Sequence, residues 1–169
     1  MSTSTAGKLP GAGSAPRPAW AYGLAGLIPF VACAAAAWGV QPIFFRLAIT
    51  AEVAYGAVIL SFLGAAHWGL ALAGQGAAGD SRTASTWLRM GFAVAPAIVG
   101  WATVLLALQP AYQATALIIQ IAAFAALWYT DLRIARLGLL PSWYPPYRFV
   151  LTAVAIAALV VSLARVLVG

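Results

Sequence analysis

Charged side chains are so rare in this sequence, and so unevenly spaced, that they leave four long uncharged stretches. There are 9 basic and 3 acidic residues among 169, and 64% of the residues are hydrophobic. A water-soluble domain of this length needs more charge to cover its surface. A helix that crosses a bilayer instead needs about 20 mostly apolar residues. The uncharged stretches therefore predict an integral membrane protein; they are Pro18–Phe45, Val53–Gly79, Met90–Thr130 and Phe149–Ala164.

One proline sets the predicted number of spans. Met90–Thr130 is too long for a single crossing and contains Gln109-Pro110, where proline lacks a donor and disfavours helix at the preceding residue. A tight helical hairpin is predicted there. Backbone groups in lipid must bond within their own segment, and the alternation typical of membrane strands is missing. We therefore predict an all-α bundle of five transmembrane helices at about 20–40, 49–73, 87–108, 111–131 and 148–168.

The domain organisation and the orientation follow from composition. Residues 1–18, rich in Ser, Gly, Ala and Pro, are predicted to form a disordered tail, and residues 19–169 a single transmembrane domain. Five spans place most basic residues on one side of the membrane, which predicts a cytoplasmic N-terminus and a C-terminus outside. The net charge of +6 also suits anionic lipid headgroups, and nucleic acid need not be invoked. The basic residues on the inner side are Lys8, Arg17, Arg82, Arg89, Arg133, Arg136 and Arg148, and those on the outer side are Arg46 and Arg165.

Common catalytic and cofactor motifs are missing from the sequence. The single Cys33 excludes a disulfide framework and a thiolate metal site. There is no phosphate-binding loop, dinucleotide fingerprint or zinc-protease motif. Ser61 and His67 are six residues apart, which puts them on opposite sides of a helix, so a nucleophile–base pair is not expected. We predict no catalytic residues, no metal, no cofactor and no enzymatic activity.

Several segments together resemble a known family. They are YGLAGLIPF at 22–30, YGAVILSFLGAAHWGLAL at 55–72, APAIVGW at 95–101, Asp131 at the end of the fourth span, and YRFVLT at 147–152. In this order they are similar to the DUF 3429 family of small integral membrane proteins of bacteria and mitochondria. The resemblance implies a multi-helix protein of the bacterial cytoplasmic (inner) membrane, or alternatively of the mitochondrial inner membrane. It implies no reaction.

His67, the only histidine, lies inside an apolar span and is the main candidate for a polar site. Polar groups in a span usually face the bundle interior, and the possible partners at the same depth are Arg89, Asp131 and Arg148. In the favoured interpretation, a neutral His67 hydrogen-bonds a neighbouring helix while Asp131 pairs with an arginine. The alternatives are a proton- or ligand-binding site, since histidine titrates near neutral pH, and ligation of a single metal or haem.

Other features of the same spans lead to structural predictions. Ser61, Ala65 and Gly69 form a ladder of small residues that permits close helix packing. Glu52 has two interpretations: a local pair with Arg46, which is worth little on a surface, or an outer access point. Two prolines, Pro29 and Pro96, are predicted to kink their helices.

Three functions are compatible with these features. The preferred one is a non-catalytic accessory subunit or assembly factor that packs in a larger membrane complex, with membrane lipids and a membrane protein as partners. The second is a small transporter or proton-binding protein that uses His67, Asp131 and Glu52, although internal repeats, which are usual in transporters, are missing. The third is an enzyme acting on a lipid or quinone, for which no convincing nucleophile is present.

Overall fold

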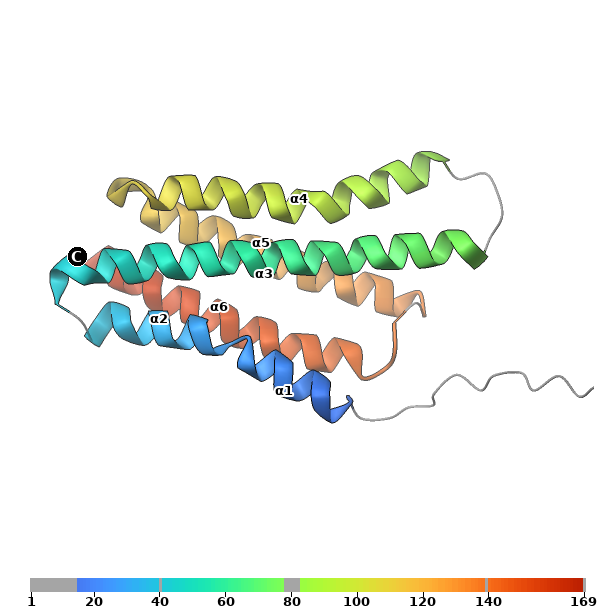
Figure 1. The fold of residues 1–169 in the computed structure, drawn as a ribbon, viewed down its shortest axis with the longest axis horizontal. Coiled ribbons are helices and arrows are strands. Elements are labelled where there is room, and N and C mark those ends of the chain that lie inside the picture. Colours follow the sequence, from blue (N-terminus) through green and yellow to red (C-terminus); the bar gives the residue numbers. More distant parts are fainter. Residues whose placement is uncertain (1–14, 40, 78–82, 139, 169) are drawn as a thin grey trace, which may run out of the picture.

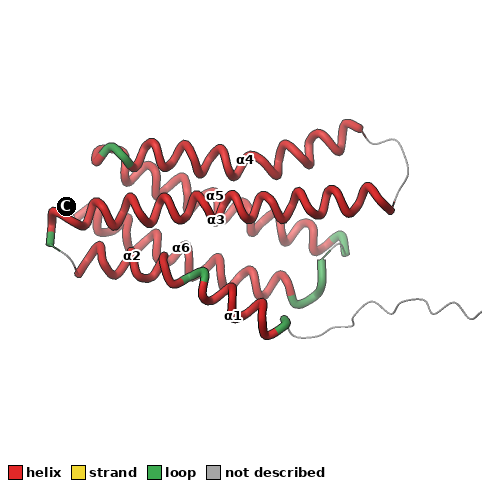
Figure 2. The backbone as a smooth tube through the Cα atoms, viewed as in Figure 1, coloured by secondary structure: helices red, strands yellow, loops and turns green. Residues whose placement is uncertain are grey.

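The computed structural model describes residues 15–39, 41–77, 83–138 and 140–168, and places their side chains except at 42, 43, 70–77 and 83–90. Each regular element in this part of the chain is helical, which confirms the all-α class (Figures 1 and 2). The elements are α1 (Arg17–Ala25), α2 (Ile28–Gly39), α3 (Pro42–Ala77), α4 (Thr83–Ala107), the 3₁₀ turn η1 (Pro110–Tyr112), α5 (Gln113–Arg136) and α6 (Tyr144–Val168).

The long helices lie side by side in a bundle (Figure 1). Helix α3 packs against α2, α4 and α5, while α6 packs against α5, α2 and α1. Four stretches are long and apolar enough to cross a membrane, and α4 contributes the shorter apolar helix Gly91–Ala107. The four stretches are Arg17–Gly39, Phe44–Gly69, Pro110–Arg136 and Tyr144–Val168.

The predicted hairpin at Gln109-Pro110 is present. Helix α4 ends at Ala107, η1 begins at Pro110, and α5 follows at Gln113. Gln109 has an extended backbone, with φ −99° and ψ 120°, as expected for a residue that precedes proline.

The first predicted span differs from the observed helices. Instead of one helix over 20–40, two helices meet at Gly26 and Leu27, and α1 begins at Arg17, inside the stretch assigned to the tail. Pro29 does not kink the middle of a helix but lies in the first turn of α2, where its missing N–H leaves no hydrogen bond unmade. The break frees backbone carbonyls, and the Tyr55 hydroxyl donates to the Gly26 carbonyl oxygen over 2.9 Å.

Helices α3, α5 and α6 extend beyond their predicted ends. Helix α3 has 36 residues, which corresponds to about 54 Å and exceeds a hydrocarbon core of about 30 Å. The helices run past the predicted spans because a charge marks where lipid ends, whereas a helix continues as long as its backbone bonds are made. At α6, Pro145 and Pro146 lie in the first turn, where proline is tolerated.

Glycines set the close contact between α3 and α4. A Cβ on Gly64 would collide with the Ala93 carbonyl oxygen, and one on Gly100 would come within 2.9 Å of the Ala57 Cα. Two of the three small residues predicted to mediate helix packing face away from the described part of the chain. Ala65 and Gly69 are exposed, and Ser61 donates to Ala57 O of its own helix.

This contact gives a test of the packing. Gly64→Ala is expected to lower the free energy of unfolding by about 1–3 kcal/mol, because the new methyl group meets backbone that cannot move aside cheaply. The matched control is Gly69→Ala, where none of the described residues lies within 4 Å and alanine should be neutral or stabilising by up to about 1 kcal/mol. Circular dichroism during SDS titration in mild detergent measures both. Equal effects at the two glycines would contradict the assigned α3–α4 contact.

Candidate functional site

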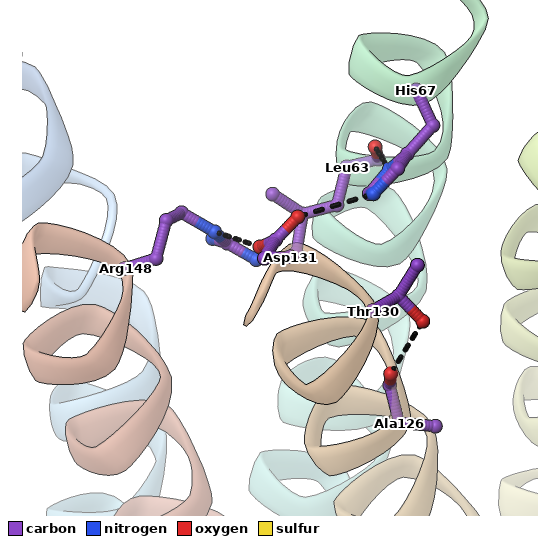
Figure 3. Close-up of polar contacts among 6 residues, drawn as sticks. All are labelled: Leu63, His67, Ala126, Thr130, Asp131 and Arg148. Carbon is purple, nitrogen blue, oxygen red and sulfur yellow. Dashed lines mark hydrogen bonds and ion pairs between the residues drawn. The ribbon is translucent and has the colours of Figure 1, made fainter. Parts of the chain in front are cut away.

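Three helices bring polar side chains together (Figure 3). Asp131 of α5 accepts a hydrogen bond from Arg148 Nε of α6 at 2.9 Å. The other carboxylate oxygen lies 3.1 Å from His67 Nε2 of α3. Both charged residues are inside the protein, with 2% of Asp131 and 6% of Arg148 exposed. Buried ions of this kind need a partner, because removal from water is costly unless charge and hydrogen bonds are both matched.

The turn between α5 and α6 makes this pairing possible. Gly138 has φ +72°, a left-handed conformation that glycine adopts without steric cost at the end of a helix. Its N–H bonds to the Ala135 carbonyl oxygen at 2.9 Å. The chain then reverses, so that Arg148, one turn into α6, faces Asp131, near the end of α5.

The His67 ring faces two hydrogen-bond acceptors. Nδ1 lies 2.9 Å from the Leu63 carbonyl oxygen, while Nε2 lies beside the Asp131 carboxylate at an angle that does not make an aligned hydrogen bond. A neutral imidazole carries only one N–H. With that hydrogen on Nδ1, the unprotonated Nε2 faces an oxygen of the Asp131 carboxylate, so that two hydrogen-bond acceptors lie side by side.

Of the candidate residues named from the sequence, the structure brings His67, Asp131 and Arg148 together. The side chain of Arg89 lies outside the described residues. Glu52 does not pair with Arg46, which corrects that prediction. Arg46 is exposed and donates to Gln113 Oε1 at 3.3 Å, whereas Glu52 is fully buried because its carboxylate turns inward to α6.

Glu52 forms a second polar contact deeper in the bundle. It accepts a short hydrogen bond from the Ser162 hydroxyl of α6. Its other oxygen, Oε1, has no hydrogen-bond partner among the described residues. A buried acceptor left without a donor costs free energy, so this carboxyl group is an unusual feature for a part of the protein that crosses lipid.

Sequence reasoning missed a third polar contact. Gln120 of α5 donates through Nε2 to the Val53 carbonyl oxygen at 2.7 Å and to Thr103 Oγ1 at 3.0 Å, and so joins α5 to α3 and α4. A side chain at Gly56 would collide with this amide. A glutamine within an apolar span was the available signal, but its partners lie on helices that are distant in the sequence.

Within the described ranges no three His, Cys, Asp or Glu side chains are grouped so that they could hold a metal ion. Cys33 has a free thiol and is partly buried. The polar contacts described above therefore constitute the candidate site, and they consist of hydrogen bonds and an ion pair between helices.

Two substitutions test whether His67 stabilises the packing of the helices. His67→Gln should change the free energy of unfolding little, because the amide retains a donor and an acceptor. His67→Leu should lower it by about 0.6–2 kcal/mol, the scale of interhelical hydrogen bonds in membranes. SDS titration followed by circular dichroism measures this, with exposed Ala65→Leu as the control. A leucine variant as stable as its control would show that the ring contributes nothing to packing.

The helical bundle, its apolar span-length segments and its inward-facing polar contacts define a multi-pass membrane protein. The chain belongs to the family described as protein of unknown function (DUF3429), which it matches over residues 15–164. It is 36% identical to transmembrane protein 69 of Xenopus tropicalis over 149 residues, which cover 88% of this chain and 54% of that relative. The chain thus spans about half the length of this relative. No solved structure matches it.

Proposed function

We propose that this protein is a non-catalytic accessory subunit or assembly factor of a larger complex in the bacterial cytoplasmic membrane. One observation carries this proposal: polar side chains at membrane depth bond to other helices of the same chain. Asp131 joins α5 to α6 and approaches α3, Glu52 joins α3 to α6, and Gln120 joins α5 to α3 and α4. Interhelical hydrogen bonds stabilise bundles in lipid. These side chains thus hold the bundle together and are not presented to a substrate.

The outer surface suits a partner helix. Ala122, Ala125 and Ala126 are exposed on α5, and small residues allow the backbones of two helices to approach closely. This face is a favourable place for a second membrane protein to pack.

Affinity purification in mild detergent tests the proposal. We expect one membrane protein to co-purify at constant stoichiometry. Ala122→Trp should reduce its recovery, whereas Val160→Trp, at an exposed position of α6, should not. Recovery of the chain only as a monomer or homodimer would contradict the proposed role.

The second candidate function is proton or ligand binding by His67, Asp131 and Glu52. The unpartnered oxygen of buried Glu52 favours it, since ionisable groups within a span are often functional. Protein reconstituted in vesicles with a trapped pH-sensitive dye distinguishes the two. The accessory role predicts no proton flux above that of empty vesicles. A flux abolished by Glu52→Gln and retained in Arg133→Gln would favour proton carriage instead.

The proposed topology has five spans with the N-terminus in the cytoplasm. Seven of the 9 basic residues belong to the segments that this topology puts inside, and α1 begins at the end of the bundle opposite the C-terminus (Figure 1). A reporter fused after Gly169 should behave as periplasmic, and one inserted in the Gly74–Ser85 segment as cytoplasmic. Both reporters on the same side would contradict the topology.

A further inference from the structure

A cavity of about 430 Å³ lies between α1, α2, α3 and α6, beside the polar contacts of Arg148. Its size falls within the range of ligand pockets, about 300–1,000 Å³. Most of its lining is apolar or aromatic and includes Leu27, Phe30, Ile59, Leu63 and Phe124.

The break between α1 and α2 explains why this space is not filled. Helix α1 is tied to α6, since the Tyr147 hydroxyl donates to the Ala19 carbonyl oxygen at 2.8 Å and the Tyr147 and Trp20 rings pack edge to face. Helix α2, beyond the break, packs on both α3 and α6. Two lining residues, Tyr22 and Phe62, are 80% and 69% exposed, so the cavity reaches the surface that faces lipid.

Two buried polar residues line this apolar space. Arg148 lines the cavity and donates through Nε to Asp131, which leaves the four N–H donors of its two Nη groups outside that bond. Thr152 is 5% exposed, and its hydroxyl has no hydrogen-bond partner in the described ranges. Thr50 and Thr130, by contrast, donate to the carbonyl four residues earlier. A buried hydroxyl without a partner costs free energy, and a ligand in the cavity would remove that cost.

The chemistry of the lining defines the ligand. Arginine only donates, so the ligand must offer acceptors near Arg148, and a second acceptor one helical turn deeper, about 6 Å along α6, near Thr152. Trp143, Tyr144 and Tyr147 also line the cavity, and such rings prefer the depth of lipid headgroups. The start of α1, the end of α5 and the start of α6 carry the charged side chains at the Arg148 end of the bundle. Those described are Arg17, Arg133, Arg136, Arg148 and Asp131. Their excess of positive charge favours the binding of an anion.

We infer that this cavity binds an anionic phospholipid, with one acyl chain in the apolar space, the phosphate at Arg148 and an ester carbonyl at Thr152. In a phospholipid the ester carbonyls lie deeper than the phosphate, which matches the order of the two residues along α6. Basic pockets between membrane helices on the cytoplasmic side bind anionic headgroups in the same way. The lipid would fill the space between these helices, and so would stabilise the bundle.

Native mass spectrometry of the full-length protein tests this inference. The protein is delipidated by detergent exchange and then incubated with dioleoyl phosphatidylglycerol or dioleoyl phosphatidylcholine. We expect one phosphatidylglycerol per chain, retained about fivefold better than phosphatidylcholine, the factor for one basic residue near an anionic headgroup. Equal retention of the two lipids, or no adduct, would overturn the inference, as would displacement of phosphatidylglycerol by a quinone.

A matched pair of substitutions locates the bound lipid. Ala66 lines the cavity and is exposed, so Ala66→Trp should block the entrance without disturbing the core. Ala65→Trp alters the neighbouring exposed position, which does not line the cavity. We expect the lipid adduct to be lost in the first variant and kept in the second, with helical content unchanged in both. The same adduct in both variants would place the lipid elsewhere and overturn the assignment.

Thr152→Val is expected to change thermal stability and lipid binding in opposite directions. Valine has nearly the shape of threonine but no hydroxyl, so the delipidated variant should melt at a higher temperature than the parent protein. The same variant should retain less phosphatidylglycerol. A variant that binds the lipid as well as the parent protein would show that the hydroxyl does not contact it.

Discussion

Asp131→Ala should lower the free energy of unfolding by about 3–5 kcal/mol, the cost of removing one partner from a buried ion pair. The substitution would leave the Arg148 guanidinium inside the protein without its carboxylate, and His67 Nε2 without its neighbour. SDS titration of the purified protein in mild detergent, followed by circular dichroism, measures the change. In membranes, the same variant should accumulate poorly.

Two further variants separate the ion pair from a general effect of removing charge. The double variant Asp131→Ala/Arg148→Ala should lose less than the sum of the two single variants, because neither charge then remains unpaired. Arg133→Ala removes an exposed charge on the same helix that bonds only to Tyr129 among the described residues, and should cost less than about 1 kcal/mol. If Asp131→Ala is as mild as Arg133→Ala, the carboxylate does not hold the three helices together.

Phe124→Ala should have the next largest effect, a loss of about 3 kcal/mol. Phe124 is 2% exposed and packs edge to face against Phe30, with ring centroids 5.8 Å apart. The value lies at the low end of the range for Phe→Ala in protein cores, because helices that separate in a bilayer stay in apolar surroundings and lose mainly packing contacts. The substitution also enlarges the cavity that Phe124 lines.

The control for this prediction is Phe149→Ala. Phe149 is 53% exposed, and its removal should change the free energy of unfolding by less than about 1 kcal/mol. Comparable losses in the two variants would show that the ring pair is not part of the core.

Local chemistry determined the class of the fold and the position of the hairpin. Long uncharged stretches in lipid must become helices, since each backbone group needs a partner within its own segment, and Gln109-Pro110 had to interrupt one of them. The same reasoning identified His67, Asp131 and Arg148 as polar residues of comparable depth. It did not determine where helices end, because Arg46 and Arg133 remain helical beyond the predicted limits.

Tertiary structure decided which polar residues meet. The sequence offered both Arg89 and Arg148 as partners for Asp131, and the structure pairs Asp131 with Arg148. It suggested Arg46 as the partner of Glu52, whereas Glu52 bonds to Ser162. The break at Gly26 and the cavity beside it were equally hidden. A helix forms from contacts only a few residues apart in the chain, and so can be read from the sequence. The rotation and register of one helix against another depend on where glycines such as Gly64 let distant segments approach, and no local pattern specifies that.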